Sequence, residues 1–308
     1  MRRTNKVRLV VLLLAVAVAS VFMVRTAEAD TRSESDELLN TRITTDGEYV
    51  PLVSLGTLTF DAGDRKFFSA RYKAANPQSF NVLQAARIRC RDTSDDTEYY
   101  SVFSTRNITA DSASSVVVHW LFTPPSAGRY ACTLWGHAKT SQGDGHRIDV
   151  ANGSIGVDDV SYPDAEEWRH TTGGDVGVGD SAYLLRRTWT AGSGDTVGVN
   201  MDVEWTNNYG KPNNGKSATA DVLLYVTQLN SEGKGCRSPH VADERFTISS
   251  DTHHDKVYLK LRDIPVSADD GCTRDFAIKA LVEHVSGNPL ILEGSASSHY
   301  SNGIALSY

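Results

Sequence analysis

Period-two alternation of apolar and polar side chains runs through most of this sequence. In the segment TVGVNMDVEW (196–205) every second residue is apolar, and polar residues such as Asp202 and Glu204 lie between them. The segments 116–122 and 256–262 alternate in the same way. Successive side chains of a β-strand point to opposite faces, so each segment predicts a strand with one buried and one solvent-exposed face. Many such strands, separated by clusters of Gly, Asn, Asp and Ser, predict an all-β fold of antiparallel sandwiches.

Two short phrases of the sequence occur twice, in the same order. PPSAGRYAC (Pro124–Cys132) is echoed by PVSADDGC (Pro265–Cys272), and in both cases an alternating strand precedes the proline. Upstream, Phe60–Gly63 (FDAG) is echoed by Trp189–Gly192 (WTAG). A phrase that joins two strands and recurs in order predicts a duplicated module. We therefore expect two tandem β-sandwich domains, each with one disulfide.

The predicted division of the chain follows from these echoes and from composition. The regions are a signal peptide (1–29), a flexible N-terminal segment (30–45), a first β-sandwich (46–150), a linker or edge region rich in Gly and Asp (151–180), and a second β-sandwich (181–308).

The N-terminal segment has the three parts of a secretory signal peptide. Basic residues surround the start of an apolar run from Leu9 to Val24, and the small residues Ala27 and Ala29 follow it. The alternative is an uncleaved membrane anchor, but the run has 16 residues where about 20 are needed to span a bilayer. We expect a secreted, extracellular protein whose mature chain has no transmembrane anchor.

Removal of residues 1–29 makes the chain more acidic. That segment contains five of the 31 Lys and Arg residues and one of the 38 acidic residues, so the net charge changes from −7 to −11. Such a surface repels phosphate backbones, and nucleic acid is excluded as a partner class.

The four cysteines, Cys90, Cys132, Cys236 and Cys272, all lie in the exported part of the chain. Four cysteines allow three pairings, and the spacing along the chain favours Cys90 with Cys132 and Cys236 with Cys272. Zinc ligation by these thiols is not expected, because the sequence has no Cys-x-x-Cys pair.

The phrase Gly128-Arg-Tyr130-Ala-Cys132 resembles the tyrosine corner of immunoglobulin-like domains, as found in secreted β-sandwich modules of bacteria. The resemblance covers some ten residues of the first module. Ser126 occupies the position where that family usually has Asp, and no Trp follows Cys90 at the family's usual distance. The resemblance implies a Greek-key sandwich, of either immunoglobulin-like or jelly-roll type, and it implies no ligand.

No catalytic motif is present in the sequence. There is no His-Glu-x-x-His, no Gly-x-Ser-x-Gly and no phosphate-binding glycine loop. The acidic run Asp92–Glu98 could ligate calcium or form a polar hairpin turn, and no EF-hand spacing supports calcium. We therefore expect no enzyme activity, no catalytic residue, no metal and no cofactor.

The loop after residue 205 combines amides with an aromatic residue. Tyr209 could stack on a sugar ring, and the nearby amides could bond to hydroxyl groups. The predicted ligand-binding residues are Asn207, Asn208, Tyr209, Asn213 and Asn214. An ordinary Asn and Gly hairpin loop is the alternative.

These observations together predict a secreted, non-catalytic binding or structural protein. It would act at the cell envelope or extracellularly, with a glycan or a protein as its partner. The alternatives are a secreted hydrolase with an unrecognised site and a protease inhibitor or toxin-like effector.

Overall fold

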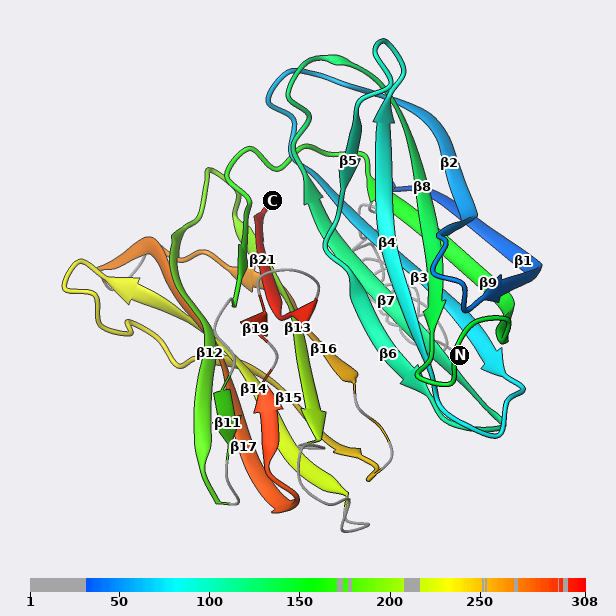
Figure 1. Ribbon diagram of the computed structural model, residues 1–308. Coiled ribbons are helices and arrows are strands. Elements are labelled where there is room, and N and C mark those ends of the chain that lie inside the picture. The colour runs from blue at the N-terminus through cyan, green and yellow to red at the C-terminus, as the bar shows by residue number, and fades with distance from the viewer. Residues whose placement is uncertain are drawn as a thin grey trace, which may run out of the picture. The chain divides into compact units, whose positions relative to one another are not determined.

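The computed structural model describes residues 32–308 apart from 171–173, 177–178, 208–216, 251, 253, 269–270, 293 and 296–298. Residues Arg32–Tyr308 form one compact unit, and its described residues form strands and turns without a helix (Figure 1). The expected signal peptide, 1–29, lies outside the described residues. Within the described ranges, no helix is long and apolar enough to cross a membrane.

Two sheets form the first sandwich. Sheet A has the strand order β1 (Arg32–Thr44), β9 (Arg147–Asp158), β3 (Lys66–Asn76) and β7 (Ser112–Phe122). Sheet B has the order β2 (Val50–Phe60), β8 (Gly128–Lys139), β4 (Val82–Asp92) and β5 (Glu98–Tyr100), and β6 (Ser104–Ile108) also pairs with β4. The inward side chains of both sheets form one core, which includes Phe68, Tyr72, Ile88 and Leu134.

Two further sheets form the second sandwich. Sheet C has the order β10 (Glu166–Arg169), β21 (Asn302–Ser307), β13 (Thr196–Asn207), β18 (Leu290–Leu292) and β11 (Gly174–Val176), and β16 (Asp255–Pro265) also pairs with β13. Sheet D has the order β12 (Ser181–Thr190), β17 (Cys272–Gly287), β14 (Ala218–Asn230) and β15 (His240–Ile248). The short strands β19 (Gly294–Ser295) and β20 (His299–Tyr300) pair in a separate two-stranded sheet. Trp205 is fully buried between these sheets.

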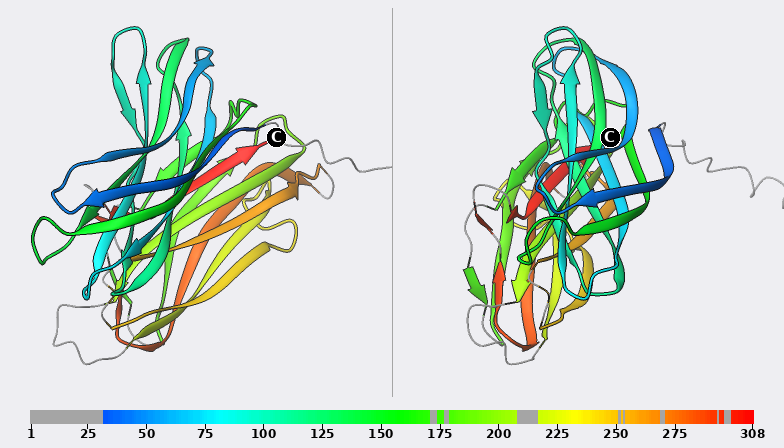
Figure 2. Two further views of the ribbon diagram at one scale, coloured as in Figure 1. Left: turned by 90° about the vertical axis from the view of Figure 1, so that its right-hand side faces the viewer. Right: turned by 45° about the vertical axis from the view of Figure 1, so that its right-hand side comes forward.

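Both sandwiches have the connectivity of a jelly roll. In the first, the chain places β1, β3, β7 and β9 in sheet A and β2, β4 and β8 in sheet B (Figures 1 and 2). In the second, it places β10, β13, β16 and β21 in sheet C and β12, β14 and β17 in sheet D. Pairs of antiparallel sheets connected in this crossing order are jelly rolls. The all-β, two-sandwich prediction is confirmed, and of the two sandwich types left open by the sequence the strand order selects the jelly roll.

The repeated phrases lie at equivalent connections in the two sandwiches. Pro124–Cys132 leads from β7 into β8, and Pro265–Cys272 leads from β16 into β17. Phe60–Gly63 begins at the last residue of β2, and Trp189–Gly192 begins at the second-last residue of β12. Each echo therefore marks the same step of the jelly roll in both halves.

The two disulfides join Cys90 to Cys132 and Cys236 to Cys272, which confirms the predicted pairing. Cys90 and Cys132 are direct partners on the neighbouring strands β4 and β8, so this bridge lies within one sheet. In immunoglobulin domains the bridge joins the two sheets. The Tyr130 hydroxyl donates a hydrogen bond to the Ser126 carbonyl at 2.9 Å, so the resemblance holds at the tyrosine and does not extend to the disulfide.

One segment differs from the sequence prediction. Residues Arg32–Thr44, expected within the flexible segment 30–45, form β1, which pairs with β9 from Arg32 opposite Asp158 to Thr44 opposite Arg147. The segment is polar because β1 is an edge strand with mostly exposed side chains, while its backbone bonds to β9 and Ile43 is buried. The region 151–180 supplies the end of β9 and two edge strands of sheet C, β10 and β11.

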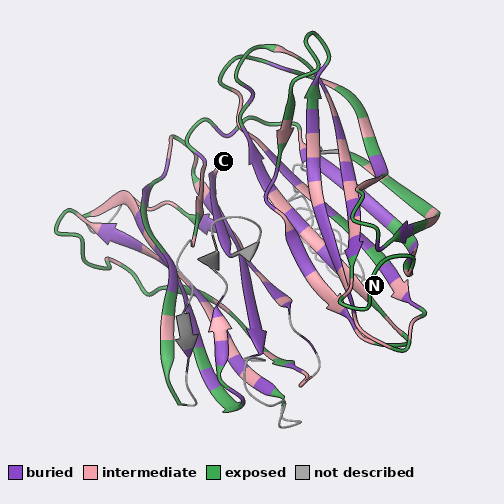
Figure 3. Cartoon of the chain, viewed as in Figure 1, coloured by how far each residue is buried: buried purple, intermediate pink, exposed green. Residues whose placement is uncertain are grey.

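The outer face of sheet C is buried rather than wet. Asn200, Asp202 and Glu204 on β13 are at most 3% exposed, and Figure 3 shows that strand buried along its length. The prediction that one face of 196–205 is exposed to solvent is therefore wrong. The reason is that β6 and β7 of the first sandwich cover it, through contacts that include a small apolar cluster around Leu121 and Ile304.

Candidate functional site

The predicted glycan-binding loop lies almost entirely outside the described residues. Asn208, Tyr209, Asn213 and Asn214 belong to the segment 208–216, so their involvement stays a prediction. Asn207 is the last residue of β13, is 1% exposed, and donates a hydrogen bond from Nδ2 to the Ser249 carbonyl at 3.3 Å. In contrast to the prediction, the structure has no exposed amide at position 207, because β13 continues to this residue inside sheet C.

A network of charged side chains lies where the two sandwiches meet. His119 Nδ1 on β7 is 2.8 Å from Asp202 Oδ1 on β13, and the Thr105 hydroxyl on β6 donates to Glu204 Oε1 at 2.6 Å. Lys256 Nζ is 3.2 Å from Glu204 Oε2, and both side chains are fully buried. The His119–Asp202 and Thr105–Glu204 bonds join the two sandwiches, and the Lys256–Glu204 pair lies within sheet C.

Glu167 on β10 is an acid at the same contact whose pKa is shifted by burial. The Leu121 backbone N–H of the first sandwich donates to Glu167 Oε2 at 3.0 Å, and Arg169 Nε is 3.9 Å from Oε1. Burial raises the pKa of Glu167 to about 7, and the nearby Asp202 adds to the rise. A buried acid with a raised pKa is found in both catalytic and structural clusters. Here its partners are groups of the contact itself.

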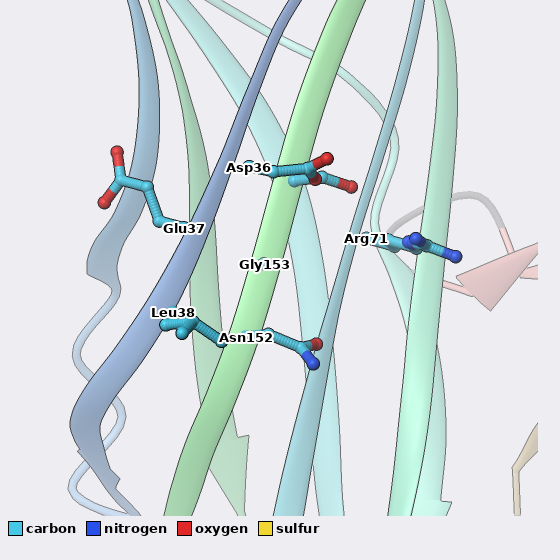
Figure 4. Close-up of a pocket in the computed structure, with 7 residues that line it drawn as sticks. Asp36, Glu37, Leu38, Arg71, Asn152 and Gly153 are labelled. Carbon is cyan, nitrogen blue, oxygen red and sulfur yellow. The ribbon is translucent and has the colours of Figure 1, made fainter.

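A separate groove opens on the outer face of sheet A. It encloses about 270 Å³ and is lined by Asp36, Glu37 and Leu38 of β1, Arg71 of β3, and Asn152, Gly153 and Ser154 of β9 (Figure 4). Its floor is β9, where the small side chain of Ser154 lies between the longer side chains of Asp36 and Arg71 on the neighbouring strands. This volume is slightly below the roughly 300–1,000 Å³ typical of ligand sites.

Strand register places three polar groups of the groove in one row. Asp36 and Arg71 are both partners of Ser154, from opposite sides of β9. Because neighbouring strands are about 4.8 Å apart, the Asp36 and Arg71 backbones are separated by about 10 Å. Figure 4 shows Asp36, Arg71 and Asn152 directed to the same side of the sheet, with Glu37 directed away from Asp36. The row therefore presents an acceptor, a hydroxyl and a set of donors in sequence.

The polar side chains of this groove are free of internal partners. In the part of the chain that the structure describes, the side chains of Asp36, Arg71 and Asn152 make no hydrogen bond or ion pair. Leu38 beside them is 94% exposed. This set contrasts with the network between the sandwiches, whose charged groups bond to one another.

The acidic run Asp92–Glu98 forms the polar hairpin between β4 and β5. Asp92 Oδ1 accepts hydrogen bonds from the Ser94 backbone and hydroxyl, and Asp95 Oδ1 accepts one from the Thr97 backbone. Asp96 pairs with Arg91, and Glu98 pairs with Arg89. Across the described residues, no cluster of three or more His, Cys, Asp or Glu side chains could hold a metal ion.

Sequence reasoning missed the groove because its residues come from three strands far apart in the chain. In the strand KFFSARYKAAN, alternation alone predicts that Arg71 points outward, because Phe68, Ala70 and Tyr72 are the buried residues. Nothing in that pattern states that β9 and β1 lie beside β3. The available signal was a polar edge strand, DELLN, that carries acids and an exposed leucine.

Comparison with known proteins identifies no family. The sequence matches no protein-family model and no curated protein. Among solved structures, the tandem domain CBM22-1-CBM22-2 of Paenibacillus barcinonensis Xyn10C aligns at 10% identity and a TM-score of 0.27, covering 92% of this chain and 100% of that chain. PNGase F, a glycosylasparaginase from Flavobacterium meningosepticum, aligns at 10% identity and a TM-score of 0.30, covering 86% and 100%. The STIV MCP aligns at 8% identity and a TM-score of 0.26, covering 89% and 96%. At these TM-scores the alignments carry no argument about function.

Proposed function

We propose that this protein is a secreted, non-catalytic binding protein that holds a unit of an extracellular glycan in the groove on sheet A. The observation that supports this proposal is the set of polar side chains without internal partners: Asp36, Arg71 and Asn152. Sugar hydroxyls both donate and accept hydrogen bonds. The carboxylate accepts, the guanidinium donates and the amide does both, so together they match neighbouring hydroxyls.

The groove also favours binding over hydrolysis. Glycoside hydrolysis needs two carboxyl groups that flank the scissile bond. Asp36 and Glu37 are adjacent on β1 and are directed to different sides (Figure 4). A single carboxylate beside Arg71 and Asn152 suits recognition, and the exposed Leu38 adds an apolar contact for a sugar face.

The test is binding of the secreted protein to a glycan array, followed by affinity measurements on variants. Arg71→Ala and Asn152→Ala are each expected to weaken binding at least tenfold, which is about 1.4 kcal/mol. Arg42→Ala is the matched control, since Arg42 is an exposed β1 arginine near Asp149 and outside the groove. Tyr209→Ala tests the loop 207–214 in the same assay.

The alternatives have distinct outcomes. Loss of binding in Tyr209→Ala with full binding in Arg71→Ala would move the site to the loop. An array without any bound glycan would overturn the glycan assignment in favour of a protein partner. Turnover of a bound polysaccharide would replace the binding role with hydrolysis.

A further inference from the structure

The outer face of sheet B carries arginines stacked on aromatic rings. We define the arginine–aromatic face by Tyr49, Arg87, Arg89, Tyr100, Trp135 and His137. The Arg87 guanidinium carbon is 3.9 Å from the centre of the Tyr49 ring and 4.3 Å from that of Tyr100. Arg89 is 3.9 Å from the centre of the Trp135 ring. Each of these contacts is within cation–π range.

Local strand patterns build this face. On β8 the inward positions are Tyr130, Cys132 and Leu134, which places Trp135 and His137 on the outer side. Register pairs Arg87 with Trp135 and Ala85 with His137. Tyr49 stacks on His137 with ring centres 4.7 Å apart. Large aromatic side chains therefore occupy positions that face solvent in an ordinary sheet.

Charge is balanced around Arg89 and Arg91 but not around Arg87. Arg89 pairs with Glu98 at 2.9 Å, and Arg91 pairs with Asp96 at 3.1 Å. Among the described residues, Arg87 has no ion pair and no hydrogen bond, and its Nε is shielded from solvent without a partner. Lys139, which is exposed, and Arg87 both act electrostatically on His137, and the Asp46 carboxylate opposes them. Arg87 is thus the arginine of this face whose charge has no ion-pair partner in the described part of the chain.

The stacking decides what kind of ligand fits. The Arg87 guanidinium stacks against both Tyr49 and Tyr100, and the Arg89 guanidinium stacks on the Trp135 ring. A cation therefore already occupies one surface of each ring, which reduces the area that the rings offer to a neutral sugar. The group without a partner is the Arg87 fork, whose parallel N–H donors match a carboxylate. Stacking holds that fork in place before the ligand arrives, which lowers the entropy lost on binding.

We propose that the arginine–aromatic face is a second binding site, which takes the carboxylate of an acidic polysaccharide through Arg87. The choice of a polysaccharide rests on the proposed function, and the choice of a carboxylate rests on the Arg87 contacts alone. The site lies on sheet B, and the groove lies on the outer face of sheet A of the same sandwich. A sandwich with a site on each sheet holds two ligand strands at once.

The experiment measures the affinity of the full secreted chain for polygalacturonate and for the same polymer after methyl esterification. Esterification keeps the sugar and removes the charge, so the wild-type protein should bind the ester at least tenfold more weakly. Arg87→Lys keeps the positive charge and removes the planar fork, and should weaken polygalacturonate binding to a similar degree. Arg91→Lys is the matched control, because Arg91 is on the same strand and has Asp96 as its partner.

Three results would overturn this proposal: no binding to polygalacturonate, equal binding of the acid and its ester, and unchanged binding in a folded Arg87→Lys. Binding of a poly-glutamate peptide that depends on Arg87, without binding of the polymer, would assign the site to a protein partner instead. The comparison of acid and ester uses the wild-type protein and does not depend on how a variant folds. If the Arg87 proposal fails, the effects of Arg71→Ala and Asn152→Ala on glycan binding are unchanged. The two proposals can therefore fail separately.

Discussion

At the scale of single residues, alternation predicts which side chains face the core but not what covers the others. Asp202 and His119 each lie on the outward side of a strand, and Asp202 is buried and His119 mostly covered because the two sandwiches meet there. Arg71 is also outward and stays exposed. The sequence pattern is the same in these cases. The outcome is set by tertiary packing, which is why the groove residues could not be selected from sequence.

Tyr130→Phe tests the hydrogen bond of the tyrosine motif. The hydroxyl donates to the Ser126 carbonyl at 2.9 Å, while the ring is buried in the core of the first sandwich. Removal of the hydroxyl keeps the packing and should cost about 1 kcal/mol of unfolding free energy. Denaturant unfolding of wild type and variant measures this difference. A variant as stable as wild type would show that the bond makes no net contribution.

Lys256→Met tests the buried ion pair between the neighbouring strands β16 and β13 of sheet C, on the side that faces the first sandwich. Its ammonium is 3.2 Å from Glu204, and both side chains are fully buried. Removal of one partner leaves a buried carboxylate with less compensation, so the variant should lose about 3–5 kcal/mol. The double variant Lys256→Met with Glu204→Gln should recover part of that loss, because it removes both charges. A double variant that is less stable than the single one would contradict this account.

At the scale of elements, the sequence predicted strands and disulfides well and edges poorly. Both cysteine pairs and the repeated strand connections could be predicted, since each depends on the spacing of residues within one module. Strand β1 was missed because its pairing with β9 bridges more than a hundred residues and its side chains are mostly polar. The outer face of β13 was misjudged because burial of that face depends on another sandwich.

Cys272→Ser tests the contribution of the second disulfide. The bridge joins Cys236 to Cys272 across 36 residues of sequence. Its loss should destabilise the second sandwich by roughly 2–5 kcal/mol, because the unfolded chain gains freedom. Calorimetry and peptide mapping of the variant measure the stability and the state of the Cys90–Cys132 bridge, which should stay intact. Mixed pairing of Cys236 with Cys90 would contradict two separate modules.

At the scale of the whole molecule, the two sandwiches share a contact that is rich in carboxylates. Glu167, Asp202 and Glu204 on sheet C bond to backbone and side-chain groups of the first sandwich. The hydrogen bonds of this contact fix how the two sandwiches are oriented, because each carboxylate needs its own donor. The apolar cluster around Leu121 and Ile304 buries surface but does not depend on one orientation in this way. Protonation of one acid therefore changes the stability of the pair of sandwiches as a unit.

Glu167 makes this stability dependent on pH. Burial raises the pKa of Glu167 to about 7 in the folded protein, against 4.5 for an ordinary Glu. A raised acid pKa means that the folded state binds the proton more tightly than the unfolded state. The stabilisation is fully present below about pH 4.5 and is lost as pH rises through about 7, a change of the order of 3 kcal/mol.

Glu167→Gln should flatten that dependence, because the amide resembles the protonated acid and cannot ionise. The expected result is wild-type stability at pH 5 and higher stability than wild type at pH 8, measured by denaturant unfolding at both values. Glu166→Gln is the matched control, since its carboxylate is on the same strand and is paired with Arg187. Equal pH dependence in wild type and Glu167→Gln would show that another group of the contact titrates in this range, and the coupling of the sandwiches to Glu167 would be wrong.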